Sequence, residues 1–330
     1  MTISMTKKAM SIAITGLVGL TLAACGSENS GESEAGEQED VNIGILQFIE
    51  HNALNSAKDG FISEIENSDY ADDTSINFDV MNSQGDQSNL QAMSEQLSEN
   101  NDLMLSIATP AAQALATTEP DKPILFTAVT DPVDAGLVES NDTPGTNLTG
   151  TSDMVPIEEQ IQLLLSIVPD AGTVGIIYNS SEPNSEIQAN LAIEELEAAG
   201  VEAKTATVTS TNDVQQVATS LISDIDALYI PTDNTLSSTA DTVGEIAIEY
   251  QVPIVAGSIE HTEAGGLATY GIDYESLGRQ TAKMALEILE NGASPETLAV
   301  ETSEELELFV NEDMAEALGI DPESISLSTD

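Results

Sequence analysis

The sequence predicts an α/β protein with two similar doubly wound lobes, each built on a parallel sheet. Residues 42–66 and residues 173–197 each begin with a short apolar run, continue through a polar loop and end in apolar residues at helical spacing. The apolar runs are rich in β-branched residues, which is typical of strands buried on both faces of a sheet. Strands and helices then alternate in the same order after each copy, which favours a duplicated parallel-sheet unit.

The elements of the two copies follow from the same periodicities. In the first copy the expected strands are residues 43–48, 78–81, 103–107 and 123–127, with helices after 51, at 87–98 and from 109. In the second copy the expected strands are residues 174–178, 204–208, 227–230 and 253–256, with helices after 183, at 214–222 and up to 250. We expect the two copies to be joined near residues 149–156.

The first 24 residues have the pattern of a signal peptide. Two lysines precede an apolar run that is shorter than the roughly 20 residues of a membrane-spanning helix, and small residues follow it. Leu22 to Cys25 resembles the lipobox of bacterial lipoproteins, which implies cleavage before Cys25 and a lipid on its sulfur. The alternative is an ordinary signal peptide in which Cys25 plays no part. Cys25 is the only cysteine, which excludes an intrachain disulfide and a cysteine-based zinc site.

Residues 25–40 are expected to form an acidic, flexible tether. Gly26 to Asp40 contains no apolar residue larger than alanine and carries many carboxylates. Such a segment cannot bury a core, so we expect it to hold a folded domain away from the membrane.

The charge of the chain restricts its partners. The sequence has 58 acidic and 7 basic residues and a formal net charge of −51, with the acidic residues spread through every expected helix. This charge excludes nucleic acid and other polyanions as partners of any large surface. A dispersed acidic excess is typical of proteins from salt-rich media, where screening weakens the self-repulsion. A protein with several calcium sites is the alternative, but no D-x-D-x-D-G loop occurs.

The ligand site is expected where the strands end, because open parallel sheets bind ligands in the crevice at their carboxyl ends. The loops there are rich in Thr, Ser, Asn and Asp, and several of them begin helices. Helix N-termini with hydroxyl caps offer free backbone N–H groups to a ligand carboxylate, although each such residue could instead be only a cap. The candidate ligand-binding residues are Phe48, Glu50, His51, Thr109, Thr127, Thr130, Asp131, Tyr178, Asn179, Glu182, Asn184, Ser185, Asp233 and Asn234.

Six stretches of the chain resemble one family, the substrate-binding lipoproteins of ABC transporters in their tryptophan/tyrosine-type branch. They are ILQFIEH (45–51), ATPAAQALA (108–116), FTAVTDPVDAGLV (126–138), IYNSSEPNS (177–185), YIPTDNT (229–235) and GGLATYGIDYESLGRQTAKMALEIL (265–289). The resemblance covers about residues 41–320. It implies a type I periplasmic-binding-protein fold, with a ligand closed between two lobes. The helices carry acidic residues where the family pattern leads us to expect lysines, a departure that concerns the surface and not the pocket.

The family fold also implies how the chain divides between the lobes. Lobe 1 is expected to contain residues 41–151 plus 271–298, and lobe 2 residues 152–270 plus 299–330. The hinge would have three segments, near residues 151, 270 and 298. A helix at residues 274–289, ended by Asn291 and Gly292, would return to lobe 1, and a strand at residues 306–310 would cross back to lobe 2.

The resemblance implies the extracytoplasmic solute-binding component of an ABC importer. Its ligand would be a small zwitterion, an amino acid of the tryptophan/tyrosine class, handed to a membrane permease that a separate ATPase subunit drives. We expect a monomer without a cofactor, attached to the outer face of the cell membrane by the lipid on Cys25.

A free amino acid carries an ammonium and a carboxylate, so its pocket needs an acid and several N–H or hydroxyl donors. Asp233 is the first choice for the ammonium, with Glu182 and Glu50 as alternatives. The expected donors to the carboxylate are Thr109, Thr127, Thr130 and Ser185. The expected contacts of the ligand side chain are Phe48, His51 and Tyr178, although the two aromatic residues could equally belong to the core.

An extracellular metal-binding protein or metal-dependent enzyme is the alternative function. The two histidines of the chain, His51 and His261, each lie in an Ile-Glu-His triplet just after an expected strand. If the lobes closed, the side chains of Glu50, His51, Glu260 and His261 could meet in a set that would suit zinc. No Walker A, G-x-S-x-G, H-E-x-x-H or post-strand G-x-G-x-x-G motif occurs, so a binding protein fits the sequence better than an enzyme.

We predict that Cys25→Ser releases the protein from the membrane into the medium, because the substitution removes the sulfur that would carry the lipid. The measurement compares the amount of protein in the membrane and medium fractions, with Ser27→Ala as a control that keeps Cys25. Retention of the Cys25→Ser protein on the membrane would show that the apolar segment itself is the anchor.

Overall fold

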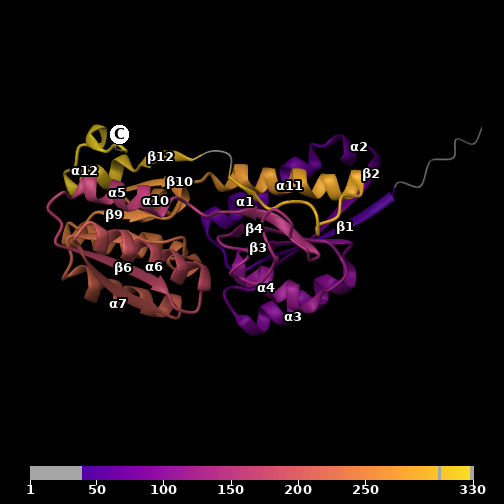
Figure 1. Ribbon diagram of the computed structural model, residues 1–330, viewed down its shortest axis with the longest axis horizontal. Helices are drawn as coiled ribbons and strands as arrows, with labels where there is room; N and C mark the ends of the chain where they lie inside the picture. The colour runs from indigo at the N-terminus through magenta and orange to yellow at the C-terminus, as the bar shows by residue number, and fades with distance from the viewer. Residues whose placement is uncertain (1–38, 304–305, 328–330) are drawn as a thin grey trace, which may run out of the picture. The chain divides into compact units, whose positions relative to one another are not determined.

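The computed structural model describes residues 39–303 and 306–327. The predicted signal peptide, Cys25 and the predicted tether up to residue 38 lie outside the described residues. Within the described part, strands and helices form two α/β lobes, each around its own six-stranded sheet (Figure 1).

The sheet of lobe 1 has the strand order β11-β5-β4-β3-β1-β2, and all of its strand pairs are parallel. Its strands are β1 (Glu39–Gln47), β2 (Thr74–Asn82), β3 (Leu103–Ile107), β4 (Ile124–Val129), β5 (Leu148–Ser152) and β11 (Glu301–Thr302). The central strands β3 and β4 are buried along their whole length, as continuous apolar runs covered on both faces should be. The strands predicted for the first copy are confirmed.

The sheet of lobe 2 has the strand order β12-β10-β9-β8-β6-β7. Its strands are β6 (Thr173–Asn179), β7 (Glu202–Val208), β8 (Ala227–Ile230), β9 (Ile254–Ala256), β10 (Ala268–Gly271) and β12 (Glu307–Val310). Each copy places its second strand at the edge and its first, third, fourth and fifth strands next in turn, so the predicted duplication is confirmed. The copies differ in their last strand, because β12 runs antiparallel to β10 whereas β11 runs parallel to β5.

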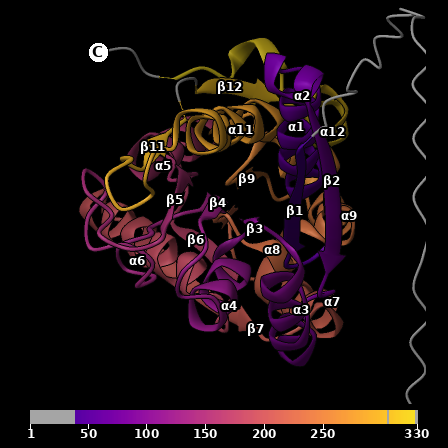
Figure 2. The same cartoon turned by 90° about the vertical axis from the view of Figure 1, so that its right-hand side faces the viewer.

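Helices cover both faces of each sheet. The helices of lobe 1 are α1 (Asn52–Glu66), α2 (Asp69–Asp73), α3 (Gln87–Asn100), α4 (Thr109–Thr118) and α11 (Tyr274–Asn291). The helices of lobe 2 are α5 (Ile157–Ile167), α6 (Pro183–Ala198), α7 (Thr211–Ile222), α8 (Asn234–Ser237), α9 (Ala240–Tyr250), α10 (Ile259–Gly265), α12 (Glu312–Leu318) and the 3₁₀ turn η1 (Pro322–Ser324). Figure 2 shows α1 and α11 on one side of the lobe 1 strands and α3 and α4 on the other.

Helix α11 lies directly against α1, and two glycines allow this close approach. A Cβ atom on Gly60 would lie 2.2 Å from the carbonyl oxygen of Glu275, and one on Gly278 would lie 1.9 Å from that of Ala57. Any larger residue at either position would force the helices apart. The late helix of the chain is therefore part of lobe 1, and Gly292, in the left-handed conformation, ends it.

The chain passes between the two sheets three times. The passages follow β5, β10 and β11, the last between Thr302 and Glu307. The sequence placed the third crossover near residue 298, but β11 still pairs with β5 in the sheet of lobe 1 through Glu301 and Thr302. A strand of two residues carries too little periodicity to be recognised in the sequence.

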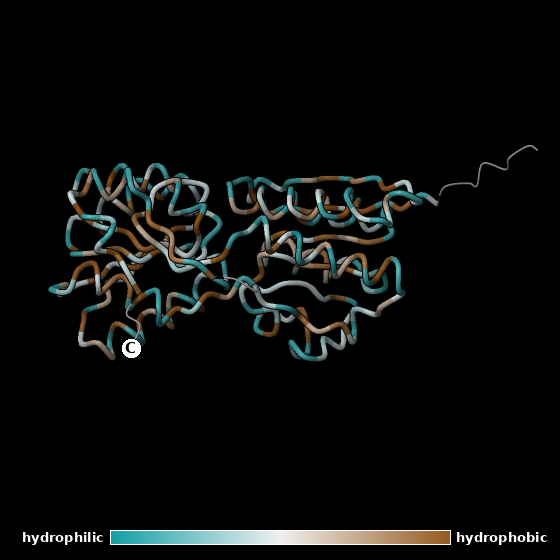
Figure 3. Tube along the Cα trace, turned by 90° about the horizontal axis from the view of Figure 1, so that it is seen from above, coloured by the Kyte–Doolittle hydropathy of each residue, from teal (hydrophilic) through white to brown (hydrophobic). Residues whose placement is uncertain are grey.

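The apolar residues lie mainly in the strands and on the inner sides of the helices, while the outer segments are hydrophilic (Figure 3). No helix in the described ranges combines the length and the apolar character that crossing a membrane requires.

Cations are scarce on this surface. Among the described residues the ion pairs are Lys58–Asp59, Lys204–Asp224 and Arg279–Glu275. None of the twelve α-helices in the described ranges carries a basic residue in its last turn, although cations there would stabilise the helix dipole. Most surface carboxylates therefore face other carboxylates or solvent.

We predict that transfer from molar to millimolar sodium chloride lowers the melting temperature, because screening between the excess negative charges is lost. The measurement is a thermal melt across a salt series, with sucrose at matched osmolality as a control that supplies no ions. A melting temperature that does not change with salt, or that sucrose restores equally, would contradict the electrostatic explanation.

Candidate ligand-binding site

Two residues at the strand ends of lobe 1 have a strained backbone. Ala108, between β3 and α4, has a φ of 83°, and Ala128, in β4, has a φ of 57°. Residues other than glycine rarely adopt positive φ, and such strain concentrates at functional sites. Thr109 and Thr127, both predicted as ligand donors, adjoin these two alanines.

A buried carboxylate organises the facing loops of lobe 2. Glu182 has 1% of its surface exposed. It accepts five hydrogen bonds, from the backbone N and Nδ2 of Asn234 (3.1 and 2.6 Å), the backbone N and Oγ1 of Thr235 (3.1 and 2.8 Å) and Nδ2 of Asn179 (3.3 Å). Glu182 therefore holds the start of α8 against the end of β6.

Asp233 lies beside Glu182 and is equally buried. Its Oδ2 accepts from the backbone N of Asn179 (2.6 Å), and its Oδ1 accepts from the backbone N of Leu236 (2.8 Å), which caps α8. Burial, and then the charge of Glu182, raise the pKa of Asp233 well above the usual range of an aspartic acid. No ion pair among the described residues involves either carboxylate. Two buried acids without a cation are a costly arrangement that a bound cationic group would relieve.

A second polar network crosses from one lobe to the other beside the hinge. Asp153 accepts from the hydroxyl of Tyr274 (2.5 Å) and from Oγ1 of Thr130 (2.9 Å). The Nε2 of Gln188, on α6, donates to the same Thr130 oxygen (3.2 Å), and its Oε1 accepts from the backbone N of Thr232 (3.2 Å). The network connects the end of β4, both of the first two passages between the sheets and the ligand loops of lobe 2.

Three buried polar atoms in these loops have no partner within the described structure. They are Oγ1 of Thr109, at the start of α4, Oδ1 of Asn184, at the start of α6, and Oγ1 of Thr232, in the loop after β8. Buried polar groups in native proteins are nearly always hydrogen-bonded, so each unpaired atom needs an explanation. One hydroxyl and one amide oxygen at helix N-termini are suited to a small zwitterionic ligand.

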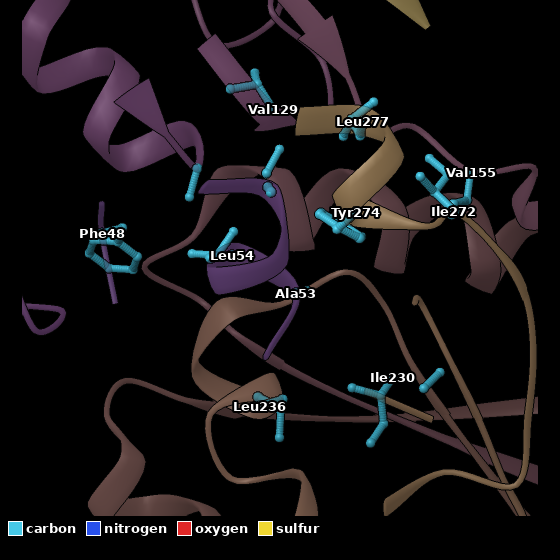
Figure 4. Close-up of a cluster of buried hydrophobic side chains, with 14 of the residues drawn as sticks. Phe48, Ala53, Leu54, Val129, Val155, Ile230, Leu236, Ile272, Tyr274 and Leu277 are labelled. Atoms are coloured by element: carbon cyan, nitrogen blue, oxygen red, sulfur yellow. The ribbon is translucent and has the colours of Figure 1, made fainter. Parts of the chain in front are cut away.

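Buried apolar side chains from both lobes form a cluster (Figure 4). Two of its members also belong to the polar networks, through the backbone N of Leu236 and the hydroxyl of Tyr274. Phe48 and Leu54 come from lobe 1, Leu236 comes from α8 of lobe 2, and Tyr274 comes from the start of α11. Each has at most 5% of its surface exposed. The site therefore combines an apolar region with the buried carboxylates.

A cavity of about 270 Å³ opens between the lobes next to this cluster. Glu50, His51, Glu260 and His261 all contribute to its lining, so both Ile-Glu-His triplets do meet here. The Nε2 of His51 lies 3.2 Å from Oδ1 of Asn234, and burial lowers the pKa of His51 to about 4. The Nδ1 of His261 lies 3.1 Å from Oγ of Ser237, and burial and then the neighbouring His51 lower the pKa of His261 to about 3.

The same four residues do not form a metal site. In residues 39–303 and 306–327, no group of three or more His, Cys, Asp or Glu side chains is placed to hold a metal ion. Glu260 uses one oxygen to accept from the backbone N of Tyr274 (3.2 Å), and Glu50 is exposed at the cavity rim. The metal alternative has no support.

The structure brings most of the predicted site residues together. The residues in or directly next to the polar clusters and the cavity are Phe48, Glu50, His51, Thr109, Thr130, Asn179, Glu182, Asn184, Ser185, Asp233 and Asn234. Ser185 and Asn184 both donate to the backbone oxygen of Thr232 (3.2 and 3.0 Å).

Three predicted residues have other surroundings. Asp131 accepts from the backbone N atoms of Val133 and Asp134 and so caps a turn. Tyr178 follows the alternation of β6 and points to the opposite face from Asn179, near Glu186. The hydroxyl of Thr127 accepts from Oγ1 of Thr151 (3.1 Å) inside lobe 1.

Sequence reasoning missed Asp153, Gln188 and Tyr274. Asp153 lies in a passage between the sheets, Tyr274 is the first residue of α11, and Gln188 lies within α6, so none is in a loop that follows a predicted strand. The only signal for Gln188 is a buried polar residue on the inner side of α6, four positions after Asn184.

Two α/β lobes of one topology, with polar strand ends and a cavity lined by both lobes, define a two-lobed solute-binding protein. Residues 42–330 match the family model described as ABC transporter substrate binding protein. The chain belongs to this family, whose members are extracytoplasmic substrate-binding components of ABC transporters.

Two kinds of relative support the assignment. The chain is 38% identical over 319 residues to a curated tyrosine-binding protein of Clostridioides difficile, which covers 94% of this chain and 92% of that one. It also resembles the crystal structure of an ABC domain from Streptococcus pneumoniae in complex with L-Trp, with 38% identity and a TM-score of 0.82 over 86% of this chain and 96% of that one.

A third relative is also a substrate-binding protein. The ligand-free, open structure of a substrate-binding protein with adhesive properties from Clostridium difficile is 40% identical, over 85% of this chain and 95% of that one, with a TM-score of 0.66.

We predict that Glu182→Ala lowers the free energy of unfolding by about 3 kcal/mol, because it leaves several buried donors of Asn179, Asn234 and Thr235 unpaired. The measurement is urea unfolding in molar salt. Glu186→Ala, an exposed position on the same helix, is the matched control and should change stability by no more than about 0.5 kcal/mol. Equal losses in the two variants would show that the carboxylate of Glu182 does not hold the loops.

Proposed function

We propose that this protein binds an aromatic amino acid of the tryptophan/tyrosine class between its lobes and delivers it to the permease of an ABC importer. The observation that carries the ligand class is the pair of buried carboxylates, which lacks a cation and lies beside an apolar cluster from both lobes. The names of the two most informative relatives, one tyrosine-binding and one solved with L-Trp, support the same class.

The ammonium of the ligand is assigned to Asp233. The oxygens of Glu182 already accept five hydrogen bonds, whereas each oxygen of Asp233 has one backbone donor. The raised pKa of Asp233 fits an acid whose charged form needs a cationic partner, and no ion pair among the described residues supplies one. The ligand ammonium would supply it, and Oδ1 of Asn184 would accept a further hydrogen bond.

The ligand carboxylate is assigned to the start of α4. Thr109 offers an unpaired buried hydroxyl there, at the positive end of the dipole of a ten-residue helix. Thr130 and Ser185 lie in the surrounding loops and complete the polar wall. The ring of the ligand would then lie against Phe48, in the apolar cluster of Figure 4.

We further propose a monomeric, lipid-anchored protein with an acidic tether, and an acidic surface suited to a salt-rich medium. The lipobox-like Leu22 to Cys25 supports the anchor, and the scarcity of ion pairs among the described residues supports the adaptation to salt. A receptor of this kind binds and releases its ligand unchanged, so no catalytic group is assigned.

We predict that Asp233→Asn removes the ligand-induced rise in melting temperature. It should also lower the unliganded melting temperature, because the amide NH2 cannot accept one of the two backbone hydrogen bonds that Asp233 accepts. In the wild type, L-tryptophan or L-tyrosine at a hundred times its dissociation constant should add about 2.7 kcal/mol of stability. This gain corresponds to a rise in melting temperature of a few degrees. The measurement is a thermal-shift panel of amino acids, nucleosides, sugars and divalent metals.

Asp226→Asn is the matched control. Asp226 also accepts two backbone hydrogen bonds, from Gly172 and Thr173 (2.8 and 2.9 Å), but it lies at the amino end of β8, away from the ligand loops. This variant should keep the ligand-induced shift. A shift that occurs only with zinc, or that survives in Asp233→Asn, would contradict the proposed binding mode.

A further inference from the structure

Both histidines of this chain meet in the cavity between the lobes. His51 comes from lobe 1 and His261 from lobe 2, and each belongs to one of the two Ile-Glu-His triplets. The sequence contains no other histidine. The proposed ligand contacts do not include His261, so they do not explain why the two rings line the same cavity.

The ring of His51 makes one of the hydrogen bonds that join the lobes. The Nδ2 of Asn234 donates to Glu182 (2.6 Å), which turns Oδ1 of Asn234 towards His51. The Nε2 of His51 must therefore carry the hydrogen. When the lobes are in contact, one chain of hydrogen bonds therefore runs from the imidazole of His51 through the amide of Asn234 to the carboxylate of Glu182.

The surroundings of His51 disfavour an imidazolium. His51 is the N-cap residue of α1, a helix of 15 residues, so the positive end of the helix dipole lies beside it. His261 faces it across the cavity, with 3% of its surface exposed, and the two rings would repel each other if both were charged.

The acidic groups around the cavity do not fully offset the effects of the helix dipole and of His261, which disfavour a charged His51. Glu50 precedes His51, Asp241 reaches the cavity from α9, and both are exposed, so solvent and salt screen them. Glu260, from α10, is mostly buried and lies near Asp273 and Glu263. Burial, as the largest cause, raises the pKa of Glu260 to about 7, so this carboxyl is protonated in the same acidic range.

We propose that His51 and His261 form a proton-sensitive latch, in which the lobes close with both rings neutral and acidification opens them and releases the ligand. This inference rests on the proposed function, because it describes the regulation of the same cleft. In an acidic medium the affinity for the amino acid would then be lower than in a neutral medium.

The direction of the effect follows from proton linkage. In the structure, with its lobes in contact, the pKa values of His51 and His261 are about 4 and about 3, against an ordinary value of 6.5. The closed form therefore binds fewer protons than an open, hydrated form between about pH 4 and about pH 6.5. Closure is fully favoured above this window and is lost as the pH falls through it. One such histidine changes the closing equilibrium about thirtyfold at pH 5.

The test is the dissociation constant of L-tryptophan and L-tyrosine at pH 7.5 and pH 5.0, measured by calorimetry in molar salt. Wild-type affinity should fall by about tenfold or more. His261→Gln should bind at pH 7.5 like the wild type and lose less affinity in acid. His51→Gln should also show a smaller ratio between the two pH values, whatever its affinity at pH 7.5. Asp233 titrates in all three proteins, so the comparison between them isolates the histidines.

Ser238→Ala is the control, since Ser238 lines the same cavity and does not titrate. It should keep the wild-type ratio. Binding at pH 7.5 with no loss at pH 5.0, or an unchanged ratio in both histidine variants, would refute the latch and leave the proposed function intact. No binding of either amino acid at pH 7.5 would refute the proposed function, and the latch with it.

Discussion

Two carboxylates buried side by side without a cation, Glu182 and Asp233, are the constraint on which the ligand cleft depends. Their hydrogen bonds fix the end of β6 and the start of α8, and so place the polar wall of lobe 2. Their charge is not neutralised by any ion pair of the described residues. Burial and the charge of Glu182 raise the pKa of Asp233, so its charged form is costly in this site, and a ligand ammonium can relieve that cost.

The same constraint links the charge of the site to the arrangement of the lobes. Asn234 contacts Glu182 on one side and His51 of lobe 1 on the other, and Gln188 joins Thr130 of lobe 1 to the neighbouring loop of lobe 2. Each contact is polar and at least partly buried, so it adds a directional hydrogen bond to the packing between the lobes. A chain with 58 acidic and 7 basic residues has few basic side chains that could neutralise such a site.

The sequence predicted the fold class because apolar residues recur at strand and helix spacing over long stretches of the chain, in two copies. Apolar runs, helical spacing and their repetition located four successive strands of each sheet, while β5, α5 and β10 were not predicted. The short elements β11, α8 and α10 were also missed, since two to seven residues carry too little pattern. The strand-end loops were also predictable, from their polar residues. Which side of a loop a residue faces was not: Tyr178 and Asn179 are neighbours, yet only Asn179 reaches the cluster. Tertiary contacts of Asp153 and Tyr274, distant in sequence, leave no local signal.

The central claim is that the buried carboxylates recognise the ammonium of an amino acid. The most direct test compares the affinity for L-tryptophan with that for indole-3-propionic acid, which has the same ring and carboxylate but no ammonium. If the carboxylate pair needs that cation, the affinity for the analogue should be lower by at least about a hundredfold, because the buried charges stay unpaired. Binding of the analogue within a few-fold of L-tryptophan would contradict the claim.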